Sequence, residues 1–218
     1  MSIELHYWPT PNGWKVSIAL HEMGLPYDLH LVNIREGEQK RPDFLRLSPN
    51  GRMPAILDPD GPDGAPIAIF ESGAILQYLA RKTGRFGGRT ERERCEVDQW
   101  LMWQMGGLGP MAGQTHHFWK FAAEDVPYAK TRYRDETARL YGVLDRQLAR
   151  DAFVVGPEPT IADFAIWPWA SLWQGQRQTL EDKPHMARWL DAMAARPGVA
   201  AGRALRANLR PADPPASR

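Results

Sequence analysis

Two neighbouring stretches decide the fold: PNGRMPAILD, residues 49–58, and IFESGAILQYLA, residues 69–80. Pro54 stands directly before a short run of strand character. Because proline has no N–H to donate to a sheet ladder, it belongs at the entry to a strand, and in a sharp entry turn its peptide bond can be cis. Phe70 ends the next apolar strand and Ser72 opens a helix. The two stretches therefore predict strand, turn, strand and helix in succession.

The junction between Phe70 and Ser72 has two interpretations. A serine at a helix N-terminus normally caps the helix. The free amides and the positive end of the helix dipole at the same place also receive a carboxylate. Glu71 beside it can hold an ammonium group, and a carboxylate site next to an ammonium site suits the head group of an α-amino acid. The residues alone leave both interpretations open.

Outward from these stretches, the first third of the chain alternates between strand and helix periodicity. Apolar residues two apart over 3–7 indicate a strand, and a helical stripe from Val16 to Met23 ends at Gly24. Pro26 prevents its continuation. Further strands are predicted over 27–34, 54–58 and 67–70, with helices around 44–47 and over 71–84. The order βαβ and then ββα predicts an α/β domain over residues 1–84.

After a linker at 85–90 the pattern is helical throughout. Helices are predicted over 91–120, 127–150, 161–174, 185–196 and 199–208, so residues 91–208 form an all-α domain. GGLG at 106–109 followed by Pro110 predicts a bend in the first of these helices. Thr160 and Asp163 form a capping box at the start of another, which we interpret as structural. The proline-rich tail, 209–218, is predicted to be disordered.

Composition excludes several classes of function. A net charge of +1 argues against nucleic acid or an anionic membrane as the main partner. Cys95 is the single cysteine, which rules out an intramolecular disulfide, a Cys-x-x-Cys pair and a multi-cysteine zinc site. His116 and His117 point apart on a helix with no cluster of acids beside them, so no metal site is predicted. No signal peptide or membrane span is indicated, and we expect a cytoplasmic protein.

The two opening stretches resemble the glutathione-binding half of the cytosolic glutathione transferases. That resemblance extends from about residue 3 to about residue 205, and it implies a thioredoxin-like α/β domain joined to an all-α domain. In the family, the residue before the cis-proline pairs its backbone with the cysteinyl part of glutathione, and a Glu/Gln-Ser pair holds the γ-glutamyl end. Carried over, these residues are Met53, Pro54, Glu71 and Ser72. The resemblance also implies a homodimer.

Four further stretches are similar to the bacterial Nu-class, whose members are glutathione-dependent disulfide-bond reductases. They are TPNGWK (10–15), GEQKRPDF (37–44), WQMGGLGPMAGQTHHF (103–118) and PYAKTRYRDETARLYGVLD (127–145). By this resemblance Thr10 and Asn12 contact the glutathione sulfur, Gln39 and Met53 contact its backbone, and Arg132 reaches the ligand from the helical domain. Met53 departs from the β-branched residue that is usual there, a change that a backbone contact tolerates.

The turn TPNG, residues 10–13, then has a chemical purpose. It offers the Thr10 hydroxyl, the Asn12 amide and the free N–H groups of a helix beginning near Gly13. All of these donate toward a sulfur anion and lower the pKa of a thiol. Tyr7 is the rival, because many members of the family activate glutathione with a tyrosine at this point. Its phase with Ile3 and Leu5 instead predicts a ring that faces the core.

These observations predict a glutathione-dependent enzyme that reduces small disulfides and also organic hydroperoxides. The reactive thiolate belongs to glutathione, which serves either as two reduced molecules or as one oxidised molecule, and no metal takes part. Two alternatives stay open: a conventional transferase that adds glutathione to electrophilic carbon, and a glutathione-binding regulatory protein without turnover.

Overall fold

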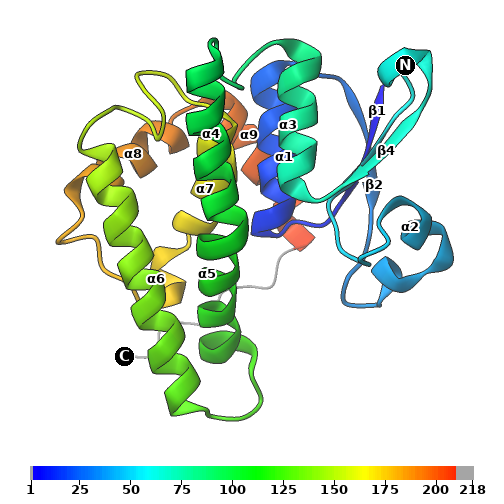
Figure 1. Cartoon of the computed structure of the whole chain (residues 1–218). Coiled ribbons are helices and arrows are strands. Elements are labelled where there is room, and N and C mark those ends of the chain that lie inside the picture. The colour runs from blue at the N-terminus through cyan, green and yellow to red at the C-terminus, as the bar shows by residue number, and fades with distance from the viewer. Residues whose placement is uncertain (1, 210–218) are drawn as a thin grey trace.

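The computed structural model describes residues 2–209, in which a small mixed sheet lies beside a bundle of helices (Figure 1). The sheet and its helices comprise β1 (Ile3–Tyr7), α1 (Pro11–Met23), β2 (Tyr27–Leu31), α2 (Pro42–Leu47), β3 (Ala55–Asp58), β4 (Ile67–Phe70) and α3 (Ser72–Thr83). The strand order is β2-β1-β3-β4, with β1 and β2 parallel and the other pairs antiparallel. A parallel pair needs a crossover connection, which α1 provides. The predicted order of elements is confirmed.

The two faces of the sheet are covered by different helices. Figure 1 shows α1 and α3 side by side on one face and α2 on the other. Ile3, Leu5 and Tyr7 of β1 are buried toward the main core, which confirms the predicted orientation of the Tyr7 ring. His6 points to the opposite face, where its ring centroid is 6.2 Å from that of Phe44 in α2. The alternation along β1 thus fills two separate cores.

In this part of the chain, the end of β2 and the start of α1 differ from their predictions. The strand predicted over 27–34 ends at Leu31, because the Asn33 side chain accepts the backbone N–H of Arg35 at 3.1 Å and turns the chain. The first helix begins at Pro11 rather than near Gly13, with Thr10 as its N-cap. Its predicted end is confirmed, since Gly24 takes the left-handed conformation at φ 69°. The Met53–Pro54 peptide bond is cis.

The second part of the chain is helical. Its helices are α4 (Glu91–Trp103), α5 (Gly109–His116), α6 (Pro127–Leu148), α7 (Ile161–Ala170), α8 (Pro184–Ala194) and α9 (Pro197–Ala204). Within residues 2–209, no helix combines the length and the apolar character that crossing a bilayer needs. The helix predicted over 161–174 ends at Ala170, and the one predicted over 199–208 covers 197–204. Apart from Leu209, the tail predicted to be disordered lies outside the described residues.

The long helix predicted over 91–120 is divided by two π turns, Gln104–Leu108 and His117–Phe121. Figure 1 shows α4 and α5 end to end on either side of the first π turn. Pro110 lacks an N–H and its ring crowds the carbonyl one turn earlier, so the chain widens by one residue before it. The π turn brings Gln104 and Met105 toward α1 and α3, a position that becomes important below.

α1 is enclosed by both parts of the molecule, with α3 on one side and α7 and α9 on the other (Figure 1). The Ser17 hydroxyl of α1 donates to the Gly202 carbonyl of α9 at 2.8 Å. A Cβ at Gly202 would lie 2.6 Å from the backbone of Ile18, so only glycine allows this approach. The helical part therefore holds α1 in place against the sheet.

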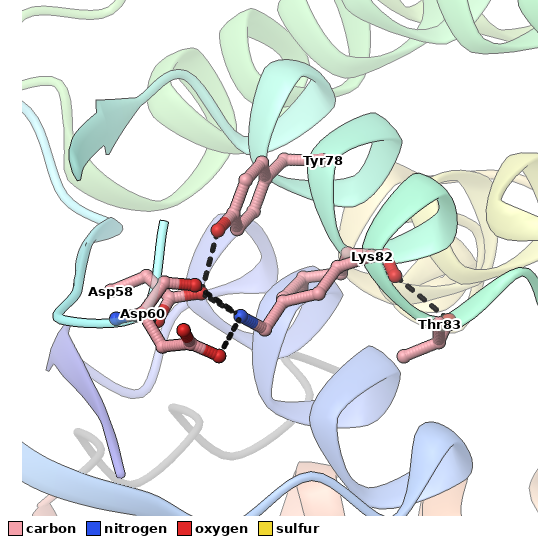
Figure 2. A network of polar contacts seen from close by, with 6 residues as sticks. Asp58, Asp60, Tyr78, Lys82 and Thr83 are labelled. Carbon is pink, nitrogen blue, oxygen red and sulfur yellow. Dashed lines mark hydrogen bonds and ion pairs between the residues drawn. The ribbon is translucent and has the colours of Figure 1, made fainter. Parts of the chain in front are cut away.

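A polar network fixes α3 to the end of β3 (Figure 2). The Tyr78 hydroxyl donates to Asp58 Oδ2 at 2.6 Å, and Lys82 Nζ lies 3.0 Å from the same oxygen and 3.3 Å from Asp60 Oδ2. Burial would raise the pKa of the Asp58 carboxyl, but the hydrogen bonds from Tyr78 and Lys82 lower it. Burial and Asp58 raise the pKa of Tyr78 to about 12. Both groups therefore keep their charge states across the neutral range.

The capping box at α7 is present and is part of a larger buried network. The Thr160 N–H donates to Asp163 Oδ2 at 2.8 Å, and Thr160 Oγ1 accepts the Ala162 N–H at 3.2 Å. Asp163 also accepts the Val154 N–H at 3.0 Å and the Trp189 indole N–H at 2.8 Å. One buried carboxylate thus joins α7, the loop before it and α8.

Asp163→Ala should lower the free energy of unfolding by about 3 to 5 kcal/mol, because it leaves several buried donors without an acceptor. Denaturant unfolding followed by circular dichroism measures the change. The matched control is Asp191→Ala, which alters an exposed acid in α8 and should cost less than about 0.5 kcal/mol. Equal costs for the two variants would show that the Asp163 network has no special role.

Candidate functional site

The site is built around the turn that leads from β1 into α1. Thr10 Oγ1 accepts the Gly13 N–H at 3.3 Å, and its hydroxyl lies 3.8 Å from Met53 Sδ. A Cβ at Gly13 would lie 2.3 Å from the Trp8 carbonyl oxygen, so glycine is required for a turn this tight. The fold thus brings the Thr10 turn against the cis Met53–Pro54 bond. A hydroxyl and the N-terminus of α1 meet there beside a sulfur atom.

Asn12 is oriented from the helical part of the chain. The indole N–H of Trp169 in α7 donates to Asn12 Oδ1 at 3.0 Å. Because an indole nitrogen only donates, the oxygen of the amide must face Trp169 and the NH₂ group must face away from it. Trp169 is in turn packed against His116, with ring centroids 6.3 Å apart. The NH₂ group of Asn12 is therefore presented as a donor.

Tyr7 has its hydroxyl directed elsewhere. The side chain is fully buried, and its O–H donates to the Leu205 carbonyl oxygen at 3.1 Å. That bond ties β1 to the segment after α9. The geometry favours a structural role for Tyr7 over a role in activating a sulfur.

The junction of β4 and α3 forms the second half of the site. Glu71 precedes α3 with φ 67°, a left-handed conformation that is uncommon for residues other than glycine and is found at ligand-binding positions. Its carboxylate accepts from Asn50 Nδ2 at 3.3 Å. Ser72 begins α3 and is buried, while Glu71 makes no side-chain cap to the helix. The free amides of α3 lie next to a carboxylate, as an amino-acid head group requires.

Gln39 has a buried acceptor that no donor in residues 2–209 reaches. It lies in a short 3₁₀ turn, Glu38–Lys40, and its Nε2 donates to the Ile34 carbonyl oxygen at 3.5 Å. Among residues 2–209 no donor reaches Gln39 Oε1, which is buried. A Cβ at Gly51 would lie 3.3 Å from the Gln39 carbonyl oxygen, so this turn is close to the loop before Met53. An N–H group of a ligand would satisfy the free acceptor.

Arg132 is not brought into contact with this group. It is exposed on α6, and in the described part of the chain it makes no hydrogen bond or ion pair with the residues of the sheet. No cluster of three or more His, Cys, Asp or Glu side chains that could hold a metal occurs within residues 2–209.

Three residues that were not predicted as site residues contact the candidate site or support those that do: Trp169, Lys15 and Gln104. Lys15 is buried on α1, and its Nζ donates to Gln104 Oε1 at 2.8 Å and to Ser72 Oγ at 3.5 Å. One indication of Lys15 is present in the sequence, namely a charged residue within a helix whose other residues are mostly buried. Trp169 and Gln104 carried no such signal, because their contacts join segments far apart in the chain.

Comparison with known proteins identifies the class. The family model for the N-terminal domain of glutathione S-transferases matches residues 10–82, and the model for the C-terminal domain matches residues 127–201. The chain therefore belongs to the glutathione S-transferase family.

Particular relatives are similar over nearly the whole chain. Disulfide-bond oxidoreductase YfcG of Escherichia coli is 48% identical over 204 residues, which cover 93% of this chain and 94% of that protein. A glutathione transferase from Pseudomonas putida, solved with one glutathione disulfide per subunit, has a TM-score of 0.89 at 42% identity and covers 94% of this chain and 92% of its own. A family member from Pseudomonas fluorescens with two glutathione molecules bound has a TM-score of 0.88 at 44% identity, with 93% and 92% covered.

Trp169→Phe should impair the activation of a bound thiol, because it removes the hydrogen bond to Asn12. Loss of the indole N–H lets the Asn12 amide rotate, so we expect the pKa of bound glutathione thiol to rise by up to about one unit. Ultraviolet absorbance of the thiolate, recorded against pH, measures the shift. Trp100→Phe on α4 is the matched control and should leave the titration unchanged. An unchanged titration for Trp169→Phe as well would show that Trp169 does not orient Asn12.

Proposed function

We propose that this protein reduces small disulfides with glutathione as the source of thiol. The observation that carries the proposal is the absence of a protein thiol from a turn built to stabilise one. Thr10 at the N-terminus of α1 lies beside Met53, and Asn12 follows in the first turn of the helix. The single cysteine, Cys95, is instead exposed on α4. The sulfur that these donors serve must then arrive with the ligand.

The residues divide the work along the tripeptide. Thr10 and Asn12 donate to the sulfur; the Thr10 hydroxyl already points at a weak sulfur acceptor, and a thiolate is a far stronger one. Gln39 and Met53 pair with the glutathione backbone, with cis Pro54 shaping the approach. Glu71 holds the γ-glutamyl ammonium group, and Ser72 with the amides of α3 holds its carboxylate. Arg132 is retained in the proposal only as a residue that reaches the ligand after side-chain movement.

The chemistry proceeds in two exchanges. The glutathione thiolate attacks one sulfur of the substrate disulfide, which forms a mixed disulfide and expels the other sulfur as a thiolate that takes up a proton. A second glutathione thiolate then attacks the glutathione sulfur of the mixed disulfide and releases the remaining thiol. Two glutathiones are oxidised to one glutathione disulfide, and one substrate disulfide becomes two thiols. No electron carrier other than glutathione is needed.

The relatives support this assignment. YfcG is named a disulfide-bond oxidoreductase, and the two Pseudomonas structures hold glutathione in the two redox forms that the exchange interconverts. We place the reaction in the cytoplasm, where the reduced glutathione pool supplies the thiol. The domain limits 1–84 and 91–208 and the reduction of hydroperoxides stay predictions.

We also propose a homodimer, with the partner subunit lying along β4 and α3. β4 is one of the two edge strands of the sheet, and a groove of about 840 Å³ lies beside it, lined by side chains that include Ile67, Phe70 and Tyr78. Phe70 is 38% exposed. An exposed aromatic side chain on an edge strand favours pairing with another chain. Asp60, Tyr78 and Lys82 of the network in Figure 2 line the same groove. Analytical ultracentrifugation tests this; a monomer at micromolar concentration would contradict it.

Paired assays on one preparation test the reaction type. Disulfide reduction should be readily measured, while conjugation of glutathione to an aryl halide should be weak. The reverse ratio would favour a conventional transferase, and binding of glutathione with neither activity would favour a regulatory protein.

Thr10→Ala combined with Asn12→Ala should lower the rate of disulfide reduction at neutral pH by about 10²- to 10³-fold. In better-known sites the loss of even one anion-stabilising donor has an effect of this size. The bound thiol should titrate nearer the free value of about 8.5, so activity should recover in part as the pH rises. Tyr7→Phe removes only a hydroxyl bonded to Leu205 and should change the rate little.

The measurement is the pH dependence of disulfide reduction for the wild type, the double variant and Tyr7→Phe. Thermal unfolding recorded in parallel separates the loss of the Thr10 cap, about 1 kcal/mol, from the loss of chemistry. Abolished activity in Tyr7→Phe with an active double variant would replace this proposal with a tyrosine-type transferase.

A further inference from the structure

Lys15 of α1 is enclosed by α3 and the π turn at Gln104–Leu108. Lysine side chains almost always keep their ammonium group in water. The residue is only 2% exposed. Besides its bonds to Gln104 and Ser72, Nζ lies 3.8 Å from Met105 Sδ. All three neighbours are neutral, and in residues 2–209 no carboxylate lies within ion-pair distance of Nζ. Within the described residues, the ammonium group therefore has no counter-ion at ion-pair distance.

The surroundings of Lys15 are built to hold it in place. Gln104 is fully buried, and a Cβ at Gly109 would lie 2.6 Å from its Nε2. A Cβ at Gly73 would lie 3.2 Å from the Met105 side chain. Two glycines thus make room for the two side chains that contact the ammonium group. The close packing of these neighbours therefore fixes the position of the lysine side chain.

The position is directly behind the N-terminus of α3. Ser72 is the first residue of α3, and its Oγ lies 3.5 Å from Nζ. An ammonium group only donates, so Ser72 Oγ accepts from it and directs its own proton to Met105 Sδ, at 3.7 Å. A thioether sulfur is a weak acceptor, and a carboxylate would take its place as a far stronger one. A carboxylate bound to that proton would lie within about 6 Å of Nζ, which is close enough for strong attraction in a buried setting.

We propose that Lys15 is a positioning residue for the γ-glutamyl carboxylate of glutathione. It holds the Ser72 hydroxyl as a donor and supplies, from inside the protein, the positive charge that this carboxylate requires. The inference rests on the proposed function, in which Ser72 and the amides of α3 receive the carboxylate, and it names the group that gives that site its charge selectivity.

The pKa of Lys15 predicts the direction in which the affinity for the ligand changes with pH. Burial lowers the pKa of Lys15 to about 7, and the nearby charge of Glu71 raises it in part. Glu71 is the charged group that faces Lys15 from the start of α3; Gln104 and Met105 face it from the π turn and are neutral. A bound carboxylate raises the pKa further, so binding takes up a proton. Affinity is then highest below pH 7 and falls as the pH rises through the bound-state value.

Calorimetry with S-methylglutathione tests this, because the blocked sulfur removes thiol ionisation from the proton balance. Titrations at pH 7 in two buffers of different ionisation enthalpy should show uptake of about half a proton per site by the wild type. Lys15→Met should take up none, bind at least about tenfold more weakly at pH 6.5, and lose the pH dependence between 6 and 8. Lys183→Met, at another buried lysine just before α8, should behave like the wild type.

The outcomes separate the two levels of the proposal. Binding by the wild type without proton uptake, or an unchanged affinity in Lys15→Met, would overturn the role of Lys15 alone. Failure of the wild type to bind S-methylglutathione would overturn the glutathione site and this inference with it. Replacement of a buried charge by an apolar side chain of similar length seldom harms folding. The wild-type proton balance decides the question even if Lys15→Met does not fold.

Discussion

The N-terminus of α1 must lie where the sheet meets the helical part of the chain, and every other feature of the site depends on that placement. α1 is held on one side by the sheet and α3 and on the other by α7 and α9, with Ser17 bonded to Gly202 and no room for a side chain at that glycine. Thr10, Asn12 and Lys15 all lie within the first turns of this helix. A shift of α1 would therefore move the donors at the sulfur end and the charge at the carboxylate end together.

The arrangement explains how a turn that contains no cysteine can serve a thiol. One end of the site gathers donors: the Thr10 hydroxyl, the Asn12 NH₂ group as turned by Trp169, and the dipole of α1. The other end pairs a carboxylate, Glu71, with the amides of α3 and the ammonium group behind them. A peptide with an amino-acid head and a thiol some distance away matches both ends. The helical part contributes orientation through Trp169 and Gln104.

Local patterns predicted much of this from the sequence. The order of strands and helices, the αL end of α1 at Gly24, the cis bond at Met53–Pro54 and the capping box of α7 each depend on a few adjacent residues whose chemistry is specific. The core position of Tyr7 followed from its alternation with Ile3 and Leu5. Predicting these features required no information about residues far away in the sequence.

The contacts that complete the site could not be predicted in this way. Trp169 and Asn12 are 157 positions apart, and Lys15 and Gln104 are 89 apart, so neither pair leaves a periodicity. The π turn that delivers Gln104 arises from the competition between Pro110 and the helix ladder, which the glycines suggested only as a bend. Arg132 shows a limit of family resemblance. The resemblance assigned it to the ligand, but within the described residues it contacts none of the other residues that the resemblance assigned to glutathione.

The central claim is that the reactive sulfur belongs to glutathione and not to the protein. The most direct measurement is steady-state reduction of a small disulfide by glutathione, with the wild type and Cys95→Ala compared on folded samples. Because Cys95 is exposed on α4 and the sulfur-binding donors lie on α1, the variant should turn over at close to the wild-type rate. A loss of about a hundredfold or more without unfolding would show that a protein thiol forms the mixed disulfide, and would contradict this account.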